Sequence, residues 1–225
     1  AKNAAARKKA IAALADTHPE LLAEFTAAKR GAEAESHLLR SSGRYPLCGV
    51  GDVNTYSVFA EHFRTILAPH GRSGIITPSG LGTDATTAAF FADTLRSERL
   101  VAFYDFENEA KIFTNVHHSF RFAISSMTGG EPVRDVRLAF YTRFVADVTA
   151  RRYALAAEEI LLLNPNTGTL PVPRTRRDAE ITLACYRRHP VLIHDGAKDA
   201  NPWACASPAS STWPMTRAAS AAPTT

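Results

Sequence analysis

Two adjacent histidines, His117 and His118, are the side chains in this sequence that most directly suggest metal or acid–base chemistry. A zinc site needs three or four ligands gathered in one cluster. Neighbouring residues on a strand point to opposite faces of a sheet, and no group of carboxylates or cysteines accompanies this pair. We therefore predict that the chain holds no metal.

The densest group of positive charge lies in the last third of the chain. It consists of Arg174, Arg176, Arg177, Arg187 and Arg188. Together with a formal net charge of +4 and a pI near 9.1, this group favours a polyanionic partner such as DNA, whose phosphates arginines neutralise. The alternative is that these arginines only form a solvated helix face, and an arginine-rich genome gives the same net charge.

The three cysteines, Cys48, Cys185 and Cys205, lack the CxxC spacing of a zinc or redox site, and we expect them to be reduced thiols. No apolar run reaches the roughly 18 residues that a membrane span needs. The basic, alanine-rich start also lacks the apolar stretch of a secretory signal. We therefore expect a cytoplasmic protein without a membrane partner.

The elements that position these groups alternate between helix and strand. Apolar periodicity, caps and turns predict helices over 2–14, 19–40, 54–68, 83–97, 156–163 and 175–188, and strands over 72–77, 100–106, 119–127 and 136–141. The break at His18-Pro19 makes the first two helices a hairpin, and either Asp52 or Asn54 can cap the third. Such alternation predicts an α/β fold with a largely parallel sheet, and one antiparallel edge strand is an alternative.

Several short motifs occur together in a fixed order. They are Gly43-Arg44-Tyr45-Pro46-Leu47, Gly51-Asp52-Val53-Asn54-Thr55-Tyr56, Phe59-Ala60-Glu61, Gly74-Ile75-Ile76-Thr77-Pro78-Ser79-Gly80, Tyr104-Asp105-Phe106-Glu107-Asn108, the segment 113–122, Asn164-Pro165-Asn166-Thr167-Gly168-Thr169 and the segment 174–180. In order and spacing they resemble the large γ-class adenine-specific DNA methyltransferases of bacterial restriction-modification and phage-defence systems, including Type IIG-like methylases. The resemblance covers roughly residues 1–203. Each motif is weak alone, whereas the ordered set is specific.

The resemblance implies the later half of a Rossmann-like class I S-adenosylmethionine-dependent methyltransferase sheet with flanking helices, followed by a small α+β extension. Residues 1–42 would be a helical hairpin insertion, 43–128 the C-terminal half of the catalytic domain, and 129–203 the extension toward a target-recognition domain. Residues 204–225 are almost entirely Ala, Ser, Thr and Pro, so we expect disorder there.

The final segment also suggests a change of reading frame. One set of codons for residues 211–217, read one nucleotide earlier, can encode Phe-Asp-Met-Ala-Asn-Asp-Ser, which resembles what the family carries shortly after a pair like Pro202-Trp203. Our hypothesis is a frame shift just after Trp203. Stop codons in the alternative frame of the gene would disprove it.

The implied reaction is methyl transfer from S-adenosylmethionine to N6 of adenine in DNA. In this family a Gly-rich cofactor loop and an Asn-Pro-Pro-aromatic catalytic motif precede the segments found here, and neither occurs in this sequence. The nearest string, Asn164-Pro165-Asn166, lies far downstream and lacks the aromatic residue. We therefore assign no catalytic residue, expect the chain to be inactive alone, and expect the cofactor to be held by the absent motifs of the parent protein.

Three groups of residues match family segments around the pocket that receives an extruded adenine. They are Asp52, Asn54 and Tyr56 beside the catalytic loop, Pro78, Ser79 and Gly80 in the pocket wall, and His118, Ser119 and Phe120 in a late hairpin. Plain structural roles are the alternatives. Asp52 or Asn54 would then only cap a helix, Gly80 and Gly82 would only form a turn, and Phe120 would pack in the core.

Two other functions stay open. The chain can be a non-catalytic DNA-binding or subunit-interaction module of a restriction or defence complex, working through residues 174–188. A separately encoded polypeptide can also supply the cofactor-binding half, with an exposed sheet edge and apolar helix faces near residues 10–40 forming the contact. Specific DNA binding without cofactor would favour the first, and copurification of such a partner would favour the second.

Overall fold

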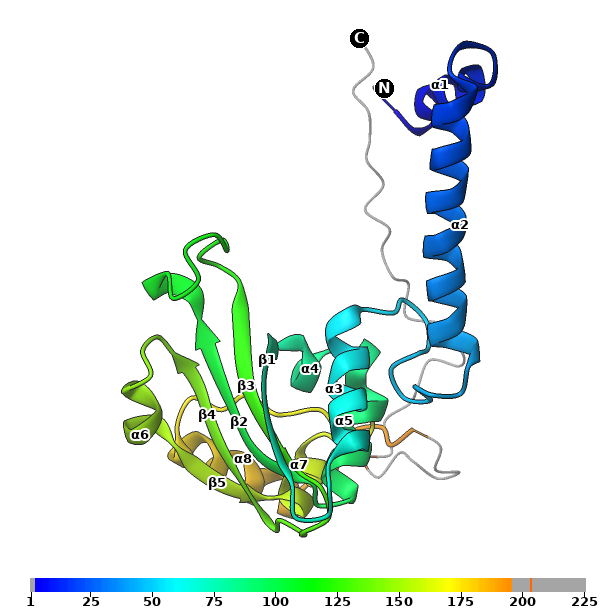
Figure 1. Ribbon diagram of the computed structural model, residues 1–225. Helices are drawn as coiled ribbons and strands as arrows, with labels where there is room; N and C mark the ends of the chain where they lie inside the picture. The colour runs from blue at the N-terminus through cyan, green and yellow to red at the C-terminus, as the bar shows by residue number, and fades with distance from the viewer. Residues whose placement is uncertain (1–2, 196–202, 204–225) are drawn as a thin grey trace.

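The computed structural model describes residues 3–195 and 203 (Figure 1). In chain order its elements are α1 (Ala4–Thr17), α2 (Pro19–Ser41), α3 (Thr55–Ile66), β1 (Arg72–Pro78), α4 (Gly80–Thr83), the 3-10 turn η1 (Ala85–Thr87), α5 (Ala88–Arg96), β2 (Leu100–Glu107), the 3-10 turn η2 (Asn108–Ala110), β3 (Arg121–Thr128), β4 (Asp135–Thr142), α6 (Asp147–Arg151), β5 (Tyr153–Ala156), α7 (Ala157–Leu163) and α8 (Arg176–Arg188). The sequence-based expectation for 204–225 lies outside the described residues.

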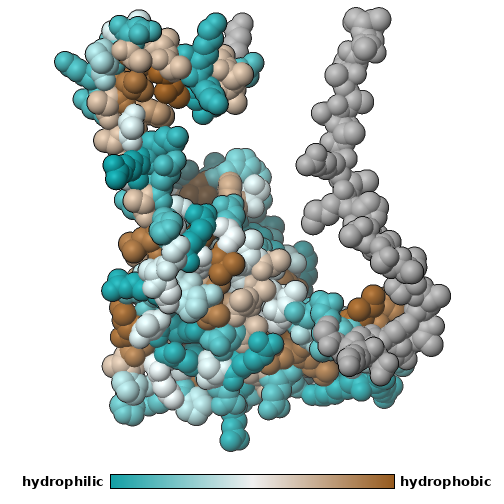
Figure 2. All heavy atoms as spheres, turned by 90° about the vertical axis from the view of Figure 1, so that its right-hand side faces the viewer, coloured by the Kyte–Doolittle hydropathy of each residue, from teal (hydrophilic) through white to brown (hydrophobic). Residues whose placement is uncertain are grey.

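Helix α1 lies across the outer end of α2, and the two helices project from the rest of the molecule (Figure 1). Asn3 caps α1, and Pro19 occupies the first turn of α2, where the missing N–H costs nothing. The two predicted helices and the break between them at His18-Pro19 are confirmed. No residue of either helix is buried, and apolar side chains gather at its outer end (Figure 2). Among the described helices, none has the length and hydropathy that crossing a membrane requires.

The five strands form one mixed sheet in the order β1-β3-β2-β4-β5. Strand β3 lies antiparallel between β1 and β2, β4 runs parallel to β2, and β5 runs antiparallel to β4. The predicted α/β class is confirmed at this coarse level. The expectation of a largely parallel sheet was wrong, because the loop from β2 returns the chain directly as β3, and such a return gives an antiparallel neighbour. Residues 43–128 supply β1–β3, and residues 129–203 add β4 and β5 to the same sheet.

Helices α3, α4, α5, α7 and α8 cover one side of this sheet (Figure 1). The core lies between the two layers, where aromatic rings of α5 meet the strands. Phe91 packs edge-on against Phe103 of β2 at 5.9 Å between ring centroids, and Phe103 contacts Phe140 of β4. Burying each such ring stabilises the fold by about 1.5–3 kcal/mol. The alternate residues of the strands, such as Tyr104 and Ile124, lie on the other side and are only partly buried.

The single helix predicted over 83–97 is broken in the structure. Asp84 has extended backbone, which ends α4, and α5 begins only at Ala88. Thr83 does not cap α5, because it is the last residue of α4 and the N-cap position of α5 is Thr87. Of the two residues expected to cap α3, Asn54 does so, and Thr175 caps α8 through a capping box that was not predicted from the sequence.

Candidate functional site

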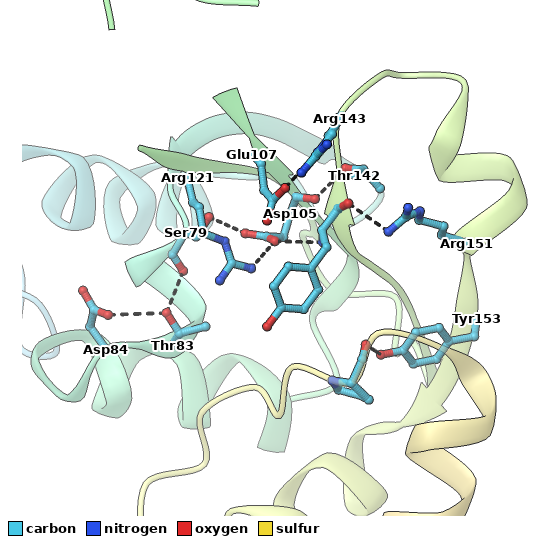
Figure 3. Close-up of polar contacts among 12 residues, drawn as sticks. Ser79, Thr83, Asp84, Asp105, Glu107, Arg121, Thr142, Arg143, Arg151 and Tyr153 are labelled. Atoms are coloured by element: carbon cyan, nitrogen blue, oxygen red, sulfur yellow. Dashed lines mark hydrogen bonds and ion pairs between the residues drawn. The ribbon is translucent and has the colours of Figure 1, made fainter. Parts of the chain in front are cut away.

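A buried carboxylate, Asp105 near the end of β2, gathers polar groups from three other strands or turns (Figure 3). Its side chain accepts hydrogen bonds from the Ser79 hydroxyl at 2.5 Å, from the Arg121 guanidinium, and from the Tyr141 backbone N–H at 3.2 Å. The Thr142 hydroxyl donates to its backbone carbonyl at 2.5 Å. Only 1% of Asp105 is exposed, so these bonds replace the water that an ionised carboxylate needs.

The topology explains why these residues meet. Strands β1, β2 and β4 run in the same direction and end together, while β3 begins at that edge. Ser79 follows β1, Tyr141 and Thr142 close β4, and Arg121 opens β3. In open α/β sheets, ligands bind outside the carboxyl ends of parallel strands. We call this cluster of Ser79, Asp105, Arg121 and Tyr141 the carboxyl-edge site.

Tyr141 has strained backbone. Its φ of 56° lies in the left-handed region, which a residue with a Cβ enters at a cost of about 1–3 kcal/mol. The register between β2 and β4 shifts at this point, because Tyr104 faces Ala139 but Phe106 faces Thr142. The extra residue forms a β-bulge, a feature that re-aims side chains next to active sites. Arg151 donates to the Tyr141 carbonyl at 2.9 Å, and the Tyr141 N–H donates to Asp105. The backbone N–H and C=O of the bulged residue are therefore both hydrogen-bonded.

The ring of Tyr141 carries two guanidinium groups. The Arg121 carbon Cζ lies 4.6 Å from the ring centroid, and that of Arg174 lies 4.7 Å away. Burial alone would lower the pKa of Arg121, but its hydrogen bond to Asp105 and the charge of that carboxylate raise it above the ordinary value. Arg121 is therefore neutralised by Asp105, whereas Arg174 is exposed and stacks on the ring. The site presents cationic, planar surface at the end of the sheet.

The turn after β1 is filled by the chain's own side chains. A Cβ on Gly80 would collide with the Asp84 carboxylate, and a Cβ on Gly82 would lie 2.9 Å from the Phe103 ring. Both glycines thus serve close packing, and neither leaves an open cradle. The packing of this turn leaves no room for a cofactor beside these two glycines.

The residues predicted around α3 lie near the turn after β1. Asn54 caps α3, its side chain accepting the Tyr56 N–H at 3.4 Å, and Asp52 is exposed in the preceding loop. Tyr56 is half-buried, and burial followed by the charge of Asp84 raises its pKa. Of the predicted wall residues, Pro78 is exposed at the end of β1 and Ser79 belongs to the carboxyl-edge site.

The predicted hairpin residues lie instead in the loop between β2 and β3. His118 contacts Glu109 at 2.9 Å, and Ser119 contacts His117 at 2.8 Å. The two imidazole rings are 4.4 Å apart, so the expectation that they point to opposite faces was wrong, because β3 begins only at residue 121. Phe120 is 63% exposed and is not a core residue. Within the described part of the chain, no group of three metal-binding side chains occurs.

The predicted DNA-contacting arginines fall into two groups. Arg174 reaches the carboxyl-edge site. Three on α8 pair with acids: Arg176 and Arg177 with Glu180 at 2.9 and 3.6 Å, and Arg187 with Glu159 at 2.6 Å. Arg188 lines a shallow hollow of about 280 Å³ along α8, which includes no residue of the carboxyl-edge site. Local pairing therefore reduces the positive field of this helix.

Three members of the site, Asp105, Arg121 and Tyr141, were not among the predicted site residues. One signal could have found Asp105. It is an acidic residue inside the apolar run from Leu100 to Phe106, and a buried carboxylate must have charged or polar partners. A comparison with protein-family models finds no match for this chain, and a search of curated proteins finds no relative.

Proposed function

We propose that this chain supplies the later half of the catalytic domain of an S-adenosylmethionine-dependent DNA methyltransferase that modifies N6 of adenine. In this proposal the carboxyl-edge site forms one wall of the pocket that receives the extruded adenine. The observation that carries it is the convergence of Ser79, Asp105, Arg121 and Tyr141 at the carboxyl ends of β1, β2 and β4.

The strand arrangement supports the finer fold assignment. Strands β1 and β2 are parallel and joined through α4 and α5, while β3 is inserted antiparallel between them. Parallel strands joined by helices on one face are the repeating unit of a Rossmann-like sheet, whereas the antiparallel β3 and β5 depart from a fully parallel one. The ordered motifs place the same segments, 74–80, 104–108 and 113–122, in that part of the family's domain.

The chemistry of the site suits a flipped nucleotide. A base taken out of the duplex is held by stacking and by hydrogen bonds to its edges. The guanidinium plane of Arg174, already stacked on Tyr141, can stack on a base or pair with a phosphate. The cofactor would supply the methyl group when bound by the other half of the domain. This chain's residues would orient the base and the adjoining phosphate.

A methylation assay tests the proposal. The chain is mixed with the polypeptide encoded directly upstream of its gene, S-adenosylmethionine and duplex DNA containing adenine. We expect N6-methyladenine from the mixture and none from the chain alone. Arg174→Ala should lower kcat/KM by about tenfold, the value of one charge-assisted contact, and the exposed Arg188→Ala should leave it unchanged. A mixture that makes no N6-methyladenine contradicts the proposal.

A non-catalytic DNA-binding module is the second candidate. The observation in its favour is the exposure of Arg176, Arg177 and Arg188 on one helix. Local pairing with Glu180 weakens it, since a neutralised arginine releases little counterion from DNA. Sequence-specific binding of duplex DNA by the chain alone, lost in Arg177→Ala with Arg188→Ala, would favour this candidate over the first.

A further inference from the structure

Strand β1 is at the end of the sheet, and its outer edge has no strand beside it within residues 3–195 and 203. The pairing with β3 shows which backbone groups are left over. In an antiparallel pair, hydrogen-bonded and non-bonded residue pairs alternate. Gly129 donates to Gly71 and Ser79 donates to Arg121, two positions that fix the alternation.

The odd-numbered residues of β1 therefore bond to β3. Arg72, Gly74 and Ile76 direct their N–H and C=O groups to the open edge, as does the carbonyl of Pro78. Natural sheets protect such edges with charges, bulges or prolines. Between Ser73 and Thr77 the strand has none of these, and its register with β3 is continuous. The edge thus offers outward N–H and C=O groups to another strand, and only its two ends carry a charge, on Arg72, or a proline, Pro78.

An apolar stripe of α3 lies at the same end of the molecule. Phe59, Phe63 and Ile66 are 57%, 36% and 61% exposed, and the two phenyl rings stack at 6.0 Å. Helix α3 contacts β1, and through Arg64 it contacts α5 on its other side. At about 100° of rotation per residue, the stripe lies roughly 100–160° around the helix from Arg64. The stripe therefore points away from α5, and α3 itself lies beside β1, the strand with the open edge (Figure 1).

The order of elements indicates what pairs with this edge. Helix α3 precedes β1 and packs on the helix-covered side of the sheet, as α4 and α5 do between β1 and β2. Parallel strands joined by a helix follow a right-handed crossover almost without exception. The strand that would precede α3 in such a unit lies parallel to β1 at its open edge. Residues 42–54 before α3 form a loop and no strand, so the chain does not supply it there.

We propose that the open edge of β1 and the stripe of Phe59, Phe63 and Ile66 dock another polypeptide, which adds a strand parallel to β1 and covers the stripe with apolar side chains. Backbone hydrogen bonds would give affinity and the stripe would give selectivity, as in other strand-addition complexes. The identity of this polypeptide as the cofactor-binding half rests on the proposed function. A second copy of this chain does not fit as the occupant. A twofold axis would pair the two β1 edges antiparallel, whereas the right-handed crossover calls for a strand parallel to β1.

Hydrogen exchange on the full chain tests the docking. The amides of Arg72, Gly74 and Ile76 are followed with and without the polypeptide encoded directly upstream. We expect their exchange to slow by about tenfold or more when the complex forms, because their N–H groups become hydrogen-bonded. Unchanged exchange of these three amides in a complex that forms would overturn the proposal, and so would the absence of any complex.

Matched variants separate the two parts of the surface. Ile76→Pro removes an outward N–H without removing a bond to β3, and should weaken association by up to about tenfold. Ile76→Ala keeps that N–H and should bind more tightly than the proline variant. Phe59→Asp with Phe63→Asp should weaken binding further, whereas Phe144→Asp with Val145→Asp, two exposed residues between β4 and α6, should not. Equal binding by both members of either pair contradicts the proposal.

Two further outcomes distinguish docking from function. Protection of the β1 amides without any methylation would retain the docking and overturn the proposed function. Methylation without protection of β1 would do the reverse. If the isolated chain forms dimers in which the same three amides are protected, the edge pairs antiparallel with a second copy and the proposed occupant is wrong.

Discussion

Two buried carboxylates, Glu61 and Asp105, have different kinds of partners. Glu61 of α3 is 3% exposed and accepts the backbone N–H groups of Leu47 at 3.2 Å and Cys48 at 2.8 Å, and it also bonds the Cys48 thiol. Asp105 accepts from a serine, an arginine and the backbone of a strained residue. A carboxylate whose partners all belong to one loop acts as a clamp. A carboxylate that holds functional side chains at a sheet edge arranges a site.

Removing the Glu61 clamp should have the largest effect on stability. Glu61→Ala leaves two N–H groups of the 45–48 turn without their charged acceptor, and we expect a loss of about 3 kcal/mol. Urea unfolding measures it. Glu61→Gln keeps one acceptor oxygen and should lose about half as much. A loss below about 1 kcal/mol in Glu61→Ala would contradict the role of a clamp.

Substitution of Asp105 should lower the free energy of unfolding by less than substitution of Glu61 does. Asp105→Asn removes the charge that neutralises Arg121, whose side chain is 35% exposed and can turn to water. We expect a loss of about 2 kcal/mol, below the range for a fully buried pair. Asp93→Asn is the control, because its ion pair with Arg64 is 50% exposed on the acid side and should cost under about 1 kcal/mol. Equal losses of unfolding free energy in the two variants would mean that Asp105 contributes no more than an exposed ion pair.

The thiol beside Glu61 makes stability depend on alkaline pH. Burial, followed by the charge and hydrogen bond of Glu61, raises the pKa of Cys48 from 9.0 to about 12. Above pH 9 the unfolded chain releases this proton and the folded chain keeps it, so stability falls as pH rises from 9 toward 12. Between pH 8 and pH 10 we expect a loss of about 1.4 kcal/mol. Cys48→Ala retains the tyrosine contributions, and a pH profile identical to that of the native chain would contradict the prediction.

Local features of this fold were predictable and long-range ones were not. The Asn54 cap of α3 joins residues only two positions apart, so a short motif predicted it. The interior position of β3 depends on pairing with both β1 and β2, which periodicity does not encode. Strand β5 has four residues and gave no usable alternation. Ser79 of the carboxyl-edge site and Arg174 beside it were predicted from short motifs. The position of Tyr141 was not, because it depends on a bulge between two strands that are distant in the sequence.

The strain at Tyr141 gives the smallest effect and the most specific test of the carboxyl-edge site. At an ordinary strand position, glycine is less stable than alanine by about 1 kcal/mol, because it loses more backbone entropy. At a φ of 56° the Cβ of alanine is penalised and glycine is not. Since both substitutions remove the ring, Tyr141→Gly should be more stable than Tyr141→Ala by about 1 kcal/mol in urea unfolding.

The same pair of substitutions at Phe140, a buried neighbour with ordinary backbone, should show the usual order with alanine more stable. If glycine is also the worse residue at position 141, the backbone there is not strained, and the bulge does not hold the Tyr141 ring against its own conformational preference. Reversal at residue 141 alone would mean that the fold stabilises an unfavourable backbone to place one ring beside Arg121 and Arg174. That cost distinguishes the Asp105 region from the Glu61 clamp, where no residue in contact with the carboxylate has positive φ.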